Sequence, residues 1–346
     1  MKFAKTALTT LCGCLLAGAV LAVEPLAAPA AAAGPAPVPV APGKPYNAET
    51  TFEKLRAAYP GIKIARKDTG TAVRVVKDLD YVRYGARALQ LDLYVPTDAA
   101  DSPHPAIVLV HGGGWRNGDR QEFAPMAARM AERGYVAAVI SYRLSPEAPY
   151  PAAIHDVKAA VRFLRVVAVQ FGIDPARIAV AGGSAGGQIA SLTGVTNGLD
   201  RFDPQAAGSK VSSAVQAIVN IDGLSDFTSE AARANEDKTG DKLSSAGAWF
   251  GGGYAEKQAL WREASPTFYV GKTTPPILFI GSGQARFAVG REAMVEKLTA
   301  AGVNSRVLLL PDTPHSFWLF DPWLDPTVNA TVDFLDQRFG LRQPRR

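Results

Sequence analysis

A serine between glycines is the first feature of this sequence that could carry out chemistry. Residues 182–186 read Gly-Gly-Ser-Ala-Gly, with Ser184 at the centre. They directly follow an apolar run at 178–181 and precede a helical segment, which predicts a sharp turn between a strand and a helix. Glycines permit such a turn and lift the serine hydroxyl above the sheet edge. Ser184 is therefore the candidate nucleophile, although the bare pattern also fits an ordinary glycine-rich turn.

A second glycine-rich stretch, His-Gly-Gly-Gly-Trp at 111–115, ends the apolar run at 106–110. A loop of this kind can direct several backbone N–H groups at one point, as acyl transfer requires when negative charge develops on a carbonyl oxygen. The expected donors are the N–H groups of Gly113, Gly114 and Ala185. A phosphate-binding loop is the alternative, but neither a Gly-Lys-Ser/Thr ending nor a Gly-x-Gly-x-x-Gly helix start is present.

The candidate base follows from chain order. A serine on a turn of this type is followed in the chain by an acid and then a histidine. Only His315 follows Ser184, because the other histidines are His104, His111 and His155. His315 comes just after the apolar run at 307–310, where a loop would carry it to the sheet edge. A lone histidine is more often structural, but this position favours a general base.

The acid that orients the imidazole is harder to assign. Its common position is the loop after the run at 277–280, yet residues 281–290 contain no carboxylate. Asp222, at the end of the run at 217–221, is the preferred candidate, although it also suits a turn or cap. Asp226 is the alternative. Asp312 lies three residues before His315 and is expected to shape that turn.

The elements that must position these residues alternate along the chain. A helix is predicted at 49–58, and strands at 73–84 and 89–95. Apolar runs typical of strands buried on both faces follow at 106–110, 136–140, 178–181, 217–221, 277–280 and 307–310. Helices are predicted at 122–133, 152–171, 185–196, 290–301 and 326–339. This alternation predicts an α/β fold with a mainly parallel central sheet and helices on both faces.

Residues 222–275 interrupt the alternation with polar, glycine-rich sequence and are a candidate small cap insertion over the site. Large aromatic residues there and elsewhere could form a wall that stacks on a sugar or feruloyl ring, although such residues more often belong to the core. The candidate substrate-binding residues are Trp115, Trp249, Tyr254 and Trp318, with Trp323 as a further member of the wall.

The first 45 residues are predicted to be a targeting sequence followed by a linker. Two lysines precede an uncharged apolar stretch, which is typical of a signal peptide at 1–22. An uncleaved anchor and a lipoprotein are alternatives, the latter because Cys12 and Cys14 lie in this stretch. Both cysteines of the chain would be removed with it, leaving no disulfide or thiol chemistry. Residues 23–45 form an Ala/Pro-rich linker, and 46–340 the folded domain.

Charge and ligand spacing exclude several other functions. The net charge of +5 is mild, and no basic run is dense enough for nucleic acid. No clustered His/Cys/Asp spacing suggests zinc, so neither a metal nor an organic cofactor is expected. After removal of the signal peptide, we expect no stable membrane association and a secreted or periplasmic location.

Together these motifs resemble the hormone-sensitive-lipase-like esterases of the α/β-hydrolase superfamily. Tyr-Arg-Leu-Ser-Pro-Glu at 142–147 and Asp-Pro-x-Arg-Ile at 174–178 add to the likeness. The C-terminal half is more similar to bacterial feruloyl- and acetyl-esterase-like carbohydrate esterases, through Trp-Phe-Gly-Gly-x-Tyr at 249–254 and Asp-Thr-Pro-His-Ser-Phe-Trp-Leu-Phe at 312–320. The resemblance spans about residues 46–340 and departs from the family pattern at the missing acid.

The resemblance implies an α/β-hydrolase fold with Ser184 as nucleophile, His315 as base, and Gly113, Gly114 and Ala185 as oxyanion donors. It implies a small ester or an ester-decorated polysaccharide as substrate, with acetyl or feruloyl groups removed from plant cell walls through an acyl-enzyme. A general short-chain aliphatic carboxylesterase is the alternative. A catalytically idle binding protein on the same scaffold, suggested by the missing acid, is the second alternative, and a peptidase the third.

Overall fold

The structure of the chain is a computed structural model that describes residues 26–27, 46–99, 102–145, 147–205, 209–238 and 243–341. The predicted signal peptide and most of the predicted linker lie outside these residues. Within the linker range, Leu26–Ala27 form β1, which pairs in parallel with β3 (Val73–Tyr84). Among the described residues, no helix combines the length and apolar character needed to cross a membrane.

Nine strands of the described residues form one sheet in the order β1-β3-β4-β6-β5-β7-β8-β9-β10. β4 runs antiparallel to β3 and β6, whereas neighbouring strands from β6 to β10 are parallel. Their bounds are β4 (Arg87–Pro96), β5 (His104–Val110), β6 (Val136–Ile140), β7 (Ile173–Gly183), β8 (Ala217–Ile221), β9 (Ile277–Gly281) and β10 (Ser305–Leu309). A second pair joins β2 (Lys63–Ile64) to β11 (Phe320–Asp321). The mainly parallel α/β sheet that the sequence predicted is confirmed.

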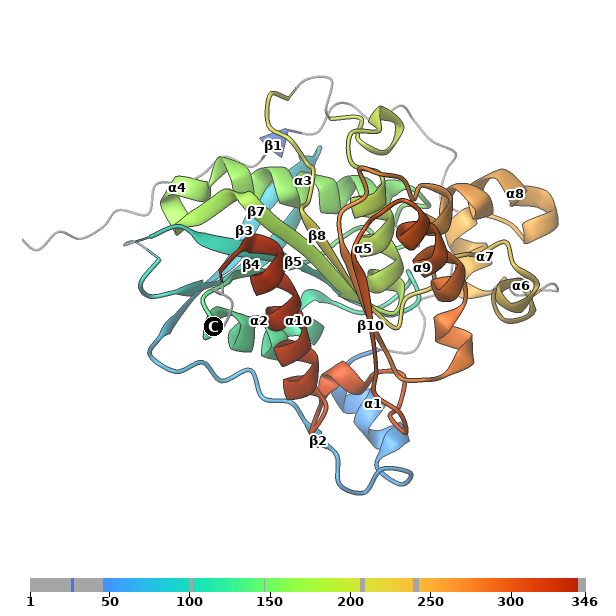
Figure 1. Ribbon diagram of the computed structural model, residues 1–346, viewed down its shortest axis with the longest axis horizontal. Helices are drawn as coiled ribbons and strands as arrows, with labels where there is room; N and C mark the ends of the chain where they lie inside the picture. The colour runs from blue at the N-terminus through green and yellow to red at the C-terminus, as the bar shows by residue number, and fades with distance from the viewer. Residues whose placement is uncertain are drawn as a thin grey trace, which may run out of the picture.

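Helices cover both faces of this sheet (Figure 1). α3 and α5 lie on one side, and α2 and α10 on the other. The helices are α1 (Ala48–Leu55), α2 (Ala124–Ala131), α3 (Ala152–Val166), α4 (Ala168–Phe171), α5 (Ala185–Val195), α6 (Glu230–Glu236), α7 (Ser245–Phe250), α8 (Tyr254–Glu263), α9 (Arg291–Ala300) and α10 (Leu324–Phe339). Short 3-10 turns are η1 (Arg120–Phe123), η2 (Asp200–Phe202), η4 (Pro266–Phe268), η5 (Ala285–Ala288) and η6 (Phe317–Leu319).

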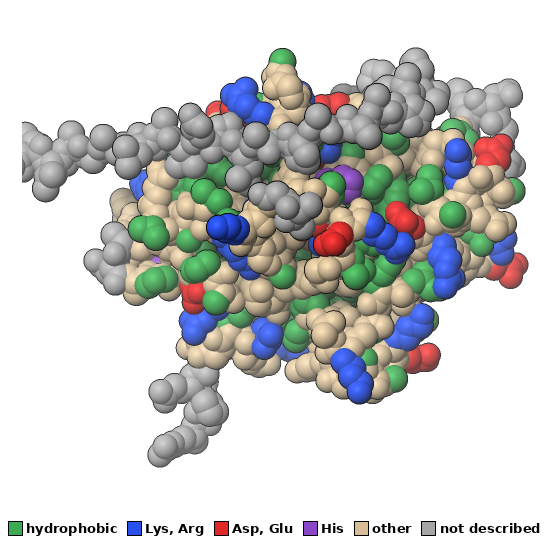
Figure 2. Space-filling view, turned by 90° about the horizontal axis from the view of Figure 1, so that it is seen from above, with side chains coloured by type: hydrophobic (Ala, Val, Ile, Leu, Met, Phe, Trp, Pro, Cys, Tyr) green, Lys and Arg blue, Asp and Glu red, His purple; other side chains and the backbone are tan. Residues whose placement is uncertain are grey.

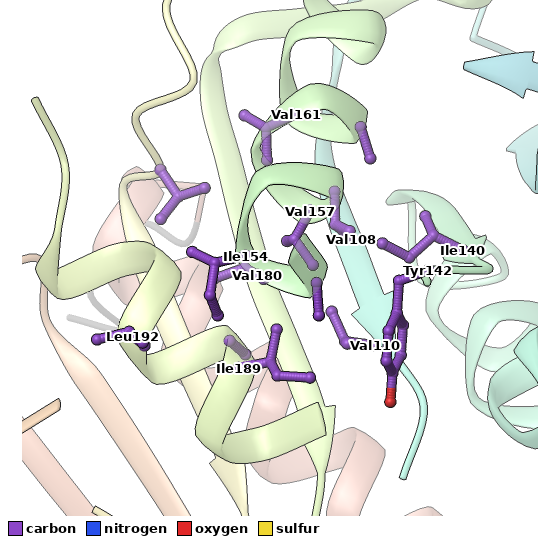
Figure 3. Close-up of a cluster of buried hydrophobic side chains, with 14 of the residues drawn as sticks. Val108, Val110, Ile140, Tyr142, Ile154, Val157, Val161, Val180, Ile189 and Leu192 are labelled. Atoms are coloured by element: carbon purple, nitrogen blue, oxygen red, sulfur yellow. The ribbon is translucent and has the colours of Figure 1, made fainter. Parts of the chain in front are cut away.

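The unbroken apolar character of the central strands follows from burial on both faces. Along β5, Val108 and Val110 contribute to the core beneath α3 and α5, whereas Ile107 and Leu109 contribute to the core beneath α2 and α10. Figure 3 shows the first of these cores, where α3 and α5 lay their apolar side chains against the strands. Each fully buried aliphatic side chain contributes about 1.5–3 kcal/mol, so the sheet forms a firm base for the loops at its edge.

Helix ends differ from the sequence expectation at two places. The helix expected at 152–171 is broken at Val167, whose backbone leaves helical geometry and separates α3 from α4. The helix expected at 122–133 begins as the 3-10 turn η1, because Asp119 caps the backbone N–H of Gln121 and tightens the first turn. Periodicity predicts that a helix exists but does not show where capping ends it.

The insertion at 222–275 contains α6, α7 and α8, which the sequence did not predict. Figure 1 shows these helices grouped at one end of the molecule. An aromatic cluster joins α7 and α8 to the segment before α6, through Phe227, Trp249, Phe250 and Trp261. α6 and α7 have only seven and six residues, which is too short for a helical period to stand out in a sequence.

The turn between β7 and α5 is pressed against the end of β5. A Cβ atom on Gly186 would lie 2.1 Å from the carbonyl oxygen of Val110 and 2.5 Å from that of His111. Real Cβ atoms do not approach backbone oxygen this closely, so only glycine permits the contact. This packing joins the two glycine-rich stretches and accounts for the last glycine of the serine motif.

This contact predicts a large stability difference between two glycine substitutions. Gly186→Ala should lower the free energy of unfolding by about 3 kcal/mol or more, because the methyl group collides with backbone that cannot move aside. Gly70→Ala is the control, since no atom lies within 4 Å of its added Cβ, and it should change stability by less than about 1 kcal/mol. Urea unfolding followed by circular dichroism measures both, and equal stabilities would contradict the packing argument.

Candidate active site

Three loops at one edge of the sheet bring together residues that are far apart in the chain. Ser184 lies between β7 and α5, Asp222 follows β8, and His315 follows β10. Because these strands are parallel, all three residues leave their strands at the same edge. The structure therefore places the three predicted catalytic residues side by side.

A line of hydrogen bonds connects the three side chains. His315 Nε2 lies 2.8 Å from Ser184 Oγ, and His315 Nδ1 lies 3.0 Å from Asp222 Oδ2. With Asp222 ionised, Nδ1 carries the proton and donates it to the carboxylate, which leaves Nε2 free to accept from the serine hydroxyl. This is the arrangement in which an imidazole acts as general base toward a serine.

Asp222 takes the place of the acid missing from the loop after β9. That loop contributes a backbone donor instead, because the N–H of Ser282 donates to Asp222 Oδ1 at 2.8 Å. The carboxylate is 3% exposed, and each of its oxygens accepts one hydrogen bond. Asp226, the alternative acid, is engaged in its own turn, where Oδ1 accepts from the backbone and hydroxyl of Thr228.

The environment of His315 favours the neutral imidazole. Burial lowers its pKa below the ordinary value of 6.5, and the hydrogen bond that His315 donates to Asp222 only partly opposes this effect. The ring lies between two aromatic side chains: Phe287 stacks face to face at 3.3 Å between centroids, and Trp318 contacts its edge at 5.4 Å. Sequence reasoning gave Phe287 no role, because nothing in its local pattern indicates contact with a residue 28 positions later.

The backbone of the site departs from ordinary conformations. Ser184, Asp222 and Trp115 are non-glycine residues with φ values of 55°, 50° and 59°. Each such conformation costs on the order of 1–3 kcal/mol and persists only where the surrounding packing enforces it. At Ser184 this strain is the sharp turn that the glycine motif predicted.

Two of the three predicted oxyanion donors, Gly114 and Ala185, line the same cleft as Ser184. The N–H groups of Gly113, Gly114 and Ala185 donate no hydrogen bond to any described part of the chain. Ala185 is the first residue of α5, so its N–H also lies at the positive end of the helix dipole. Free donors at such a position are suited to an anionic oxygen. Their assignment to an oxyanion hole remains a prediction.

His111 packs within the glycine-rich loop at 111–115 and contacts Tyr142. Its ring stacks on Tyr142 at 4.3 Å between centroids, and its Nδ1 lies 2.8 Å from the carbonyl oxygen of Gly112. The Tyr142 hydroxyl donates to the His111 carbonyl at 3.0 Å. Burial lowers the pKa of His111 to about 4, so the ring is neutral at pH 7.

The expected aromatic wall is wrong for most of its members. Trp249 and Trp318 are 0% and 1% exposed, so neither face is open to a sugar. Trp249 belongs to the core of the insertion, and Tyr254 packs on the edge of Trp261. Trp323 packs against Tyr59. Their aromatic surface is used to hold helices together, which is the more common role of such residues.

Trp115 is the one member of that set that lines the cleft above Ser184. It is 5% exposed, and its indole N–H donates to Gln188 at 3.0 Å. The cleft has a volume of about 100 Å³ and is lined by Gly114, Trp115, Ser184, Ala185, Asp222, Leu224, Glu236, Ser245, Arg286 and Phe287. Glu236 and Ser245 come from the insertion, which therefore forms part of the cleft wall.

An ion pair crosses the mouth of this cleft. Arg286, in η5, approaches Glu236, at the end of α6, at 3.0 Å. The sequence gave no signal for this pair, because its members are 50 residues apart and belong to different elements.

The described residues contain no other candidate chemistry of the kinds considered. They hold no group of three or more His, Cys, Asp or Glu side chains that could bind a metal ion. On the visible part of the face in Figure 2, basic side chains lie scattered among acidic and apolar ones instead of forming a stripe.

Comparisons with known proteins identify the family of the chain. The family model BD-FAE matches residues 91–289. Esterase LipC of Mycobacterium tuberculosis is 34% identical over 276 residues, which cover 74% of this chain but 64% of LipC. A bifunctional GH43-CE protein of Bacteroides eggerthii superposes with a TM-score of 0.64 at 26% identity, over 76% of this chain and 38% of that one.

A truncated carbohydrate esterase from gut microbiota gives a TM-score of 0.65 at 24% identity, over 80% of this chain and 99% of that one, and supports the fold. The chain thus spans a little under two thirds of LipC, and the family resemblance inferred from the motifs is confirmed. By motif, fold and family match, the chain belongs to the BD-FAE family, among the hormone-sensitive-lipase-like esterases of the α/β-hydrolase superfamily.

Proposed function

We propose that this protein is a serine carboxylic-ester hydrolase that removes acetyl groups from plant cell-wall polysaccharides. One observation carries the proposal: the hydrogen-bonded line from Asp222 through His315 ends at Ser184, in a cleft that Gly114 and Ala185 also line. Nucleophile, base, orienting acid and oxyanion donors are the parts that acyl transfer to a serine requires.

The reaction proceeds in two halves. His315 Nε2 takes the hydroxyl proton as Ser184 Oγ attacks the ester carbonyl, and the N–H groups of Gly113, Gly114 and Ala185 stabilise the resulting oxyanion. The C–O bond to the alcohol then breaks, and the imidazolium gives its proton to the departing oxygen. Water repeats the sequence on the acyl-enzyme, so that the acid is released and Ser184 is restored.

The size of the cleft favours acetyl over feruloyl among the groups that the sequence suggested. A volume of about 100 Å³ is well below the roughly 300–1,000 Å³ of pockets that enclose drug-sized ligands. A two-carbon acyl group fits this space, whereas a feruloyl group carries a substituted aromatic ring. The polysaccharide part of the proposal draws support from the likeness to the bifunctional GH43-CE protein of Bacteroides eggerthii. The signal-like N-terminus supports action outside the cytoplasm.

A general short-chain carboxylesterase is the second candidate. The same small cleft and the match to LipC, which is named only as an esterase, support it. Its alcohol side would accept any small leaving group, without preference for a sugar. A catalytically idle binding protein was suggested only by the missing acid. The hydrogen bond between His315 and Asp222 speaks against that alternative.

A substrate panel tests the reaction and the acyl group together. We expect release of acetate from p-nitrophenyl acetate and acetylated xylan, slower turnover of p-nitrophenyl butyrate, and little turnover of methyl ferulate. Ser184→Ala should lower kcat by about 10⁴-fold or more, because the nucleophile is lost. Equal rates for wild type and Ser184→Ala would overturn the esterase proposal. Faster cleavage of methyl ferulate than of acetyl esters would overturn only the acyl assignment, and inactivity on acetylated xylan alone would favour the second candidate.

Two matched aspartate variants test the acid. Asp222→Asn should lower kcat by about 10²-fold or more, because the amide favours the wrong imidazole tautomer. Asp226→Asn makes the same change four residues later in the chain. The Asp226 side chain accepts hydrogen bonds from Thr228 within its own turn, so this variant should leave kcat within about threefold. Steady-state kinetics on p-nitrophenyl acetate decide between them, and the reverse pattern would move the assignment to Asp226.

The dependence of the rate on pH follows from the environment of His315. The base acts only when neutral, so kcat/KM should be full above the imidazole pKa and fall as pH drops through it. Because burial lowers that pKa, the midpoint of the acid limb should lie below 6.5. A pH series at fixed ionic strength measures it. A midpoint well above 7 would show that His315 is charged at neutral pH, contrary to this site.

A further inference from the structure

Glu122 links the two loops that carry the oxyanion donors and the base. It lies in η1, and one of its carboxylate oxygens, Oε1, accepts two hydrogen bonds. The backbone N–H of Gly112 donates at 3.1 Å, and the indole N–H of Trp318 donates at 3.0 Å. The loop at 111–115 and the loop after β10 thus meet at a single oxygen atom.

Each of the two donors touches the reacting groups. Gly112 directly precedes the proposed oxyanion donors, and a Cβ atom on it would lie 3.4 Å from Ser184 Cβ and 3.2 Å from Glu122 Oε1. Trp318 contacts the edge of the His315 ring, and its indole also closes against Gly183, beside the nucleophile. A shift of Glu122 would therefore reach both the oxyanion loop and the base.

The carboxylate is an unusual choice for this position. Glu122 is 9% exposed, it forms no ion pair with any described Lys, Arg or His, and its second oxygen, Oε2, is buried without a partner. Burial is the main cause that raises the pKa of Glu122, and the nearby charge of Asp119 adds to it. The hydrogen bonds from Trp318 and Gly112 oppose this effect only in part, and the pKa is raised to about 7. Tyr46 and Tyr142 are the other titratable groups whose ionisation it influences. A buried carboxyl group with one unpartnered oxygen costs free energy compared with an apolar side chain of similar size.

We propose that Glu122 is a positioning residue that holds the oxyanion loop and the histidine loop at a fixed separation by accepting a hydrogen bond from each with the same oxygen. The inference rests on the esterase function proposed above. Oxyanion donors act only when they lie about 2.7–3.1 Å from the developing charge, and misplacement by about 1 Å can cost about 10²-fold in rate. Loss of this link should therefore reduce kcat and leave KM nearly unchanged.

The test compares variants that keep or remove the acceptor. Glu122→Leu, which leaves two buried N–H groups unpaired, should lower kcat on p-nitrophenyl acetate by about 10- to 100-fold, with KM within about threefold. Glu122→Gln keeps an acceptor oxygen and should restore kcat to within about fivefold of wild type. Glu49→Leu is the control, because exposed Glu49 lines the same cavity of about 460 Å³ as Glu122 and bonds to neither loop. It should leave kcat unchanged.

A second set covers the case in which Glu122→Leu does not fold. Trp318→Phe removes one donor and keeps an aromatic ring against His315, so it should lower kcat by several-fold. In the Glu122→Gln background, which keeps the acceptor, Trp318→Phe should lower kcat by a similar factor, because the hydrogen bond that it removes is still present there. An unchanged kcat in Trp318→Phe would contradict the link through Glu122. Normal kcat in Glu122→Leu, or Glu122→Gln as impaired as Glu122→Leu, would overturn the positioning role. The esterase proposal stands or falls separately, on the comparison of wild type with Ser184→Ala.

Discussion

The site depends on the close backbone contact between the start of α5 and the end of β5. Gly186 lies against the carbonyl oxygens of Val110 and His111, so closely that a Cβ atom at position 186 would not fit. This one contact fixes the turn that carries the nucleophile relative to the loop that carries the donors. The two loops then share a rigid base, because β5 and β7 are paired from Ala106 to Val110. Rigidity here has a chemical purpose, since donors that must reorganise during the reaction give little stabilisation.

Much of the fold was predictable because the central strands are buried on both faces. The run at 136–140 matches the strand bounds of the structure, since nothing polar interrupts it, and the run at 217–221 matches them although it contains Asn220. The insertion was not predictable in the same way. Its helices are short, and they are stabilised by aromatic contacts between segments far apart in the chain. Sequence periodicity reports how a segment meets the core and says little about segments that pack mainly on one another.

Some residues of the candidate site were predictable from the sequence and others were not. Ser184, His315 and Asp222 were found because strand ends and chain order restrict where such residues can lie, and the structure brings them within hydrogen-bonding distance. Phe287 and Glu122 were missed, since their importance comes only from neighbours supplied by other loops. The aromatic wall failed for the opposite reason. The residue type suggested stacking on a sugar, but its large apolar surface was already used in the core.

Because the acid comes from the end of β8, the loop after β9 does not have to provide it. The loop after β9 supplies to Asp222 only the backbone N–H of Ser282, which almost any amino acid at that position would also provide. The side chains of this loop therefore do not have to supply the acid. Two of them, Arg286 and Phe287, line the cleft instead. A substitution at Arg286 would change the lining of the cleft and keep every member of the hydrogen-bonded line from Asp222 to Ser184, whereas one at Phe287 would also remove the ring stacked on His315.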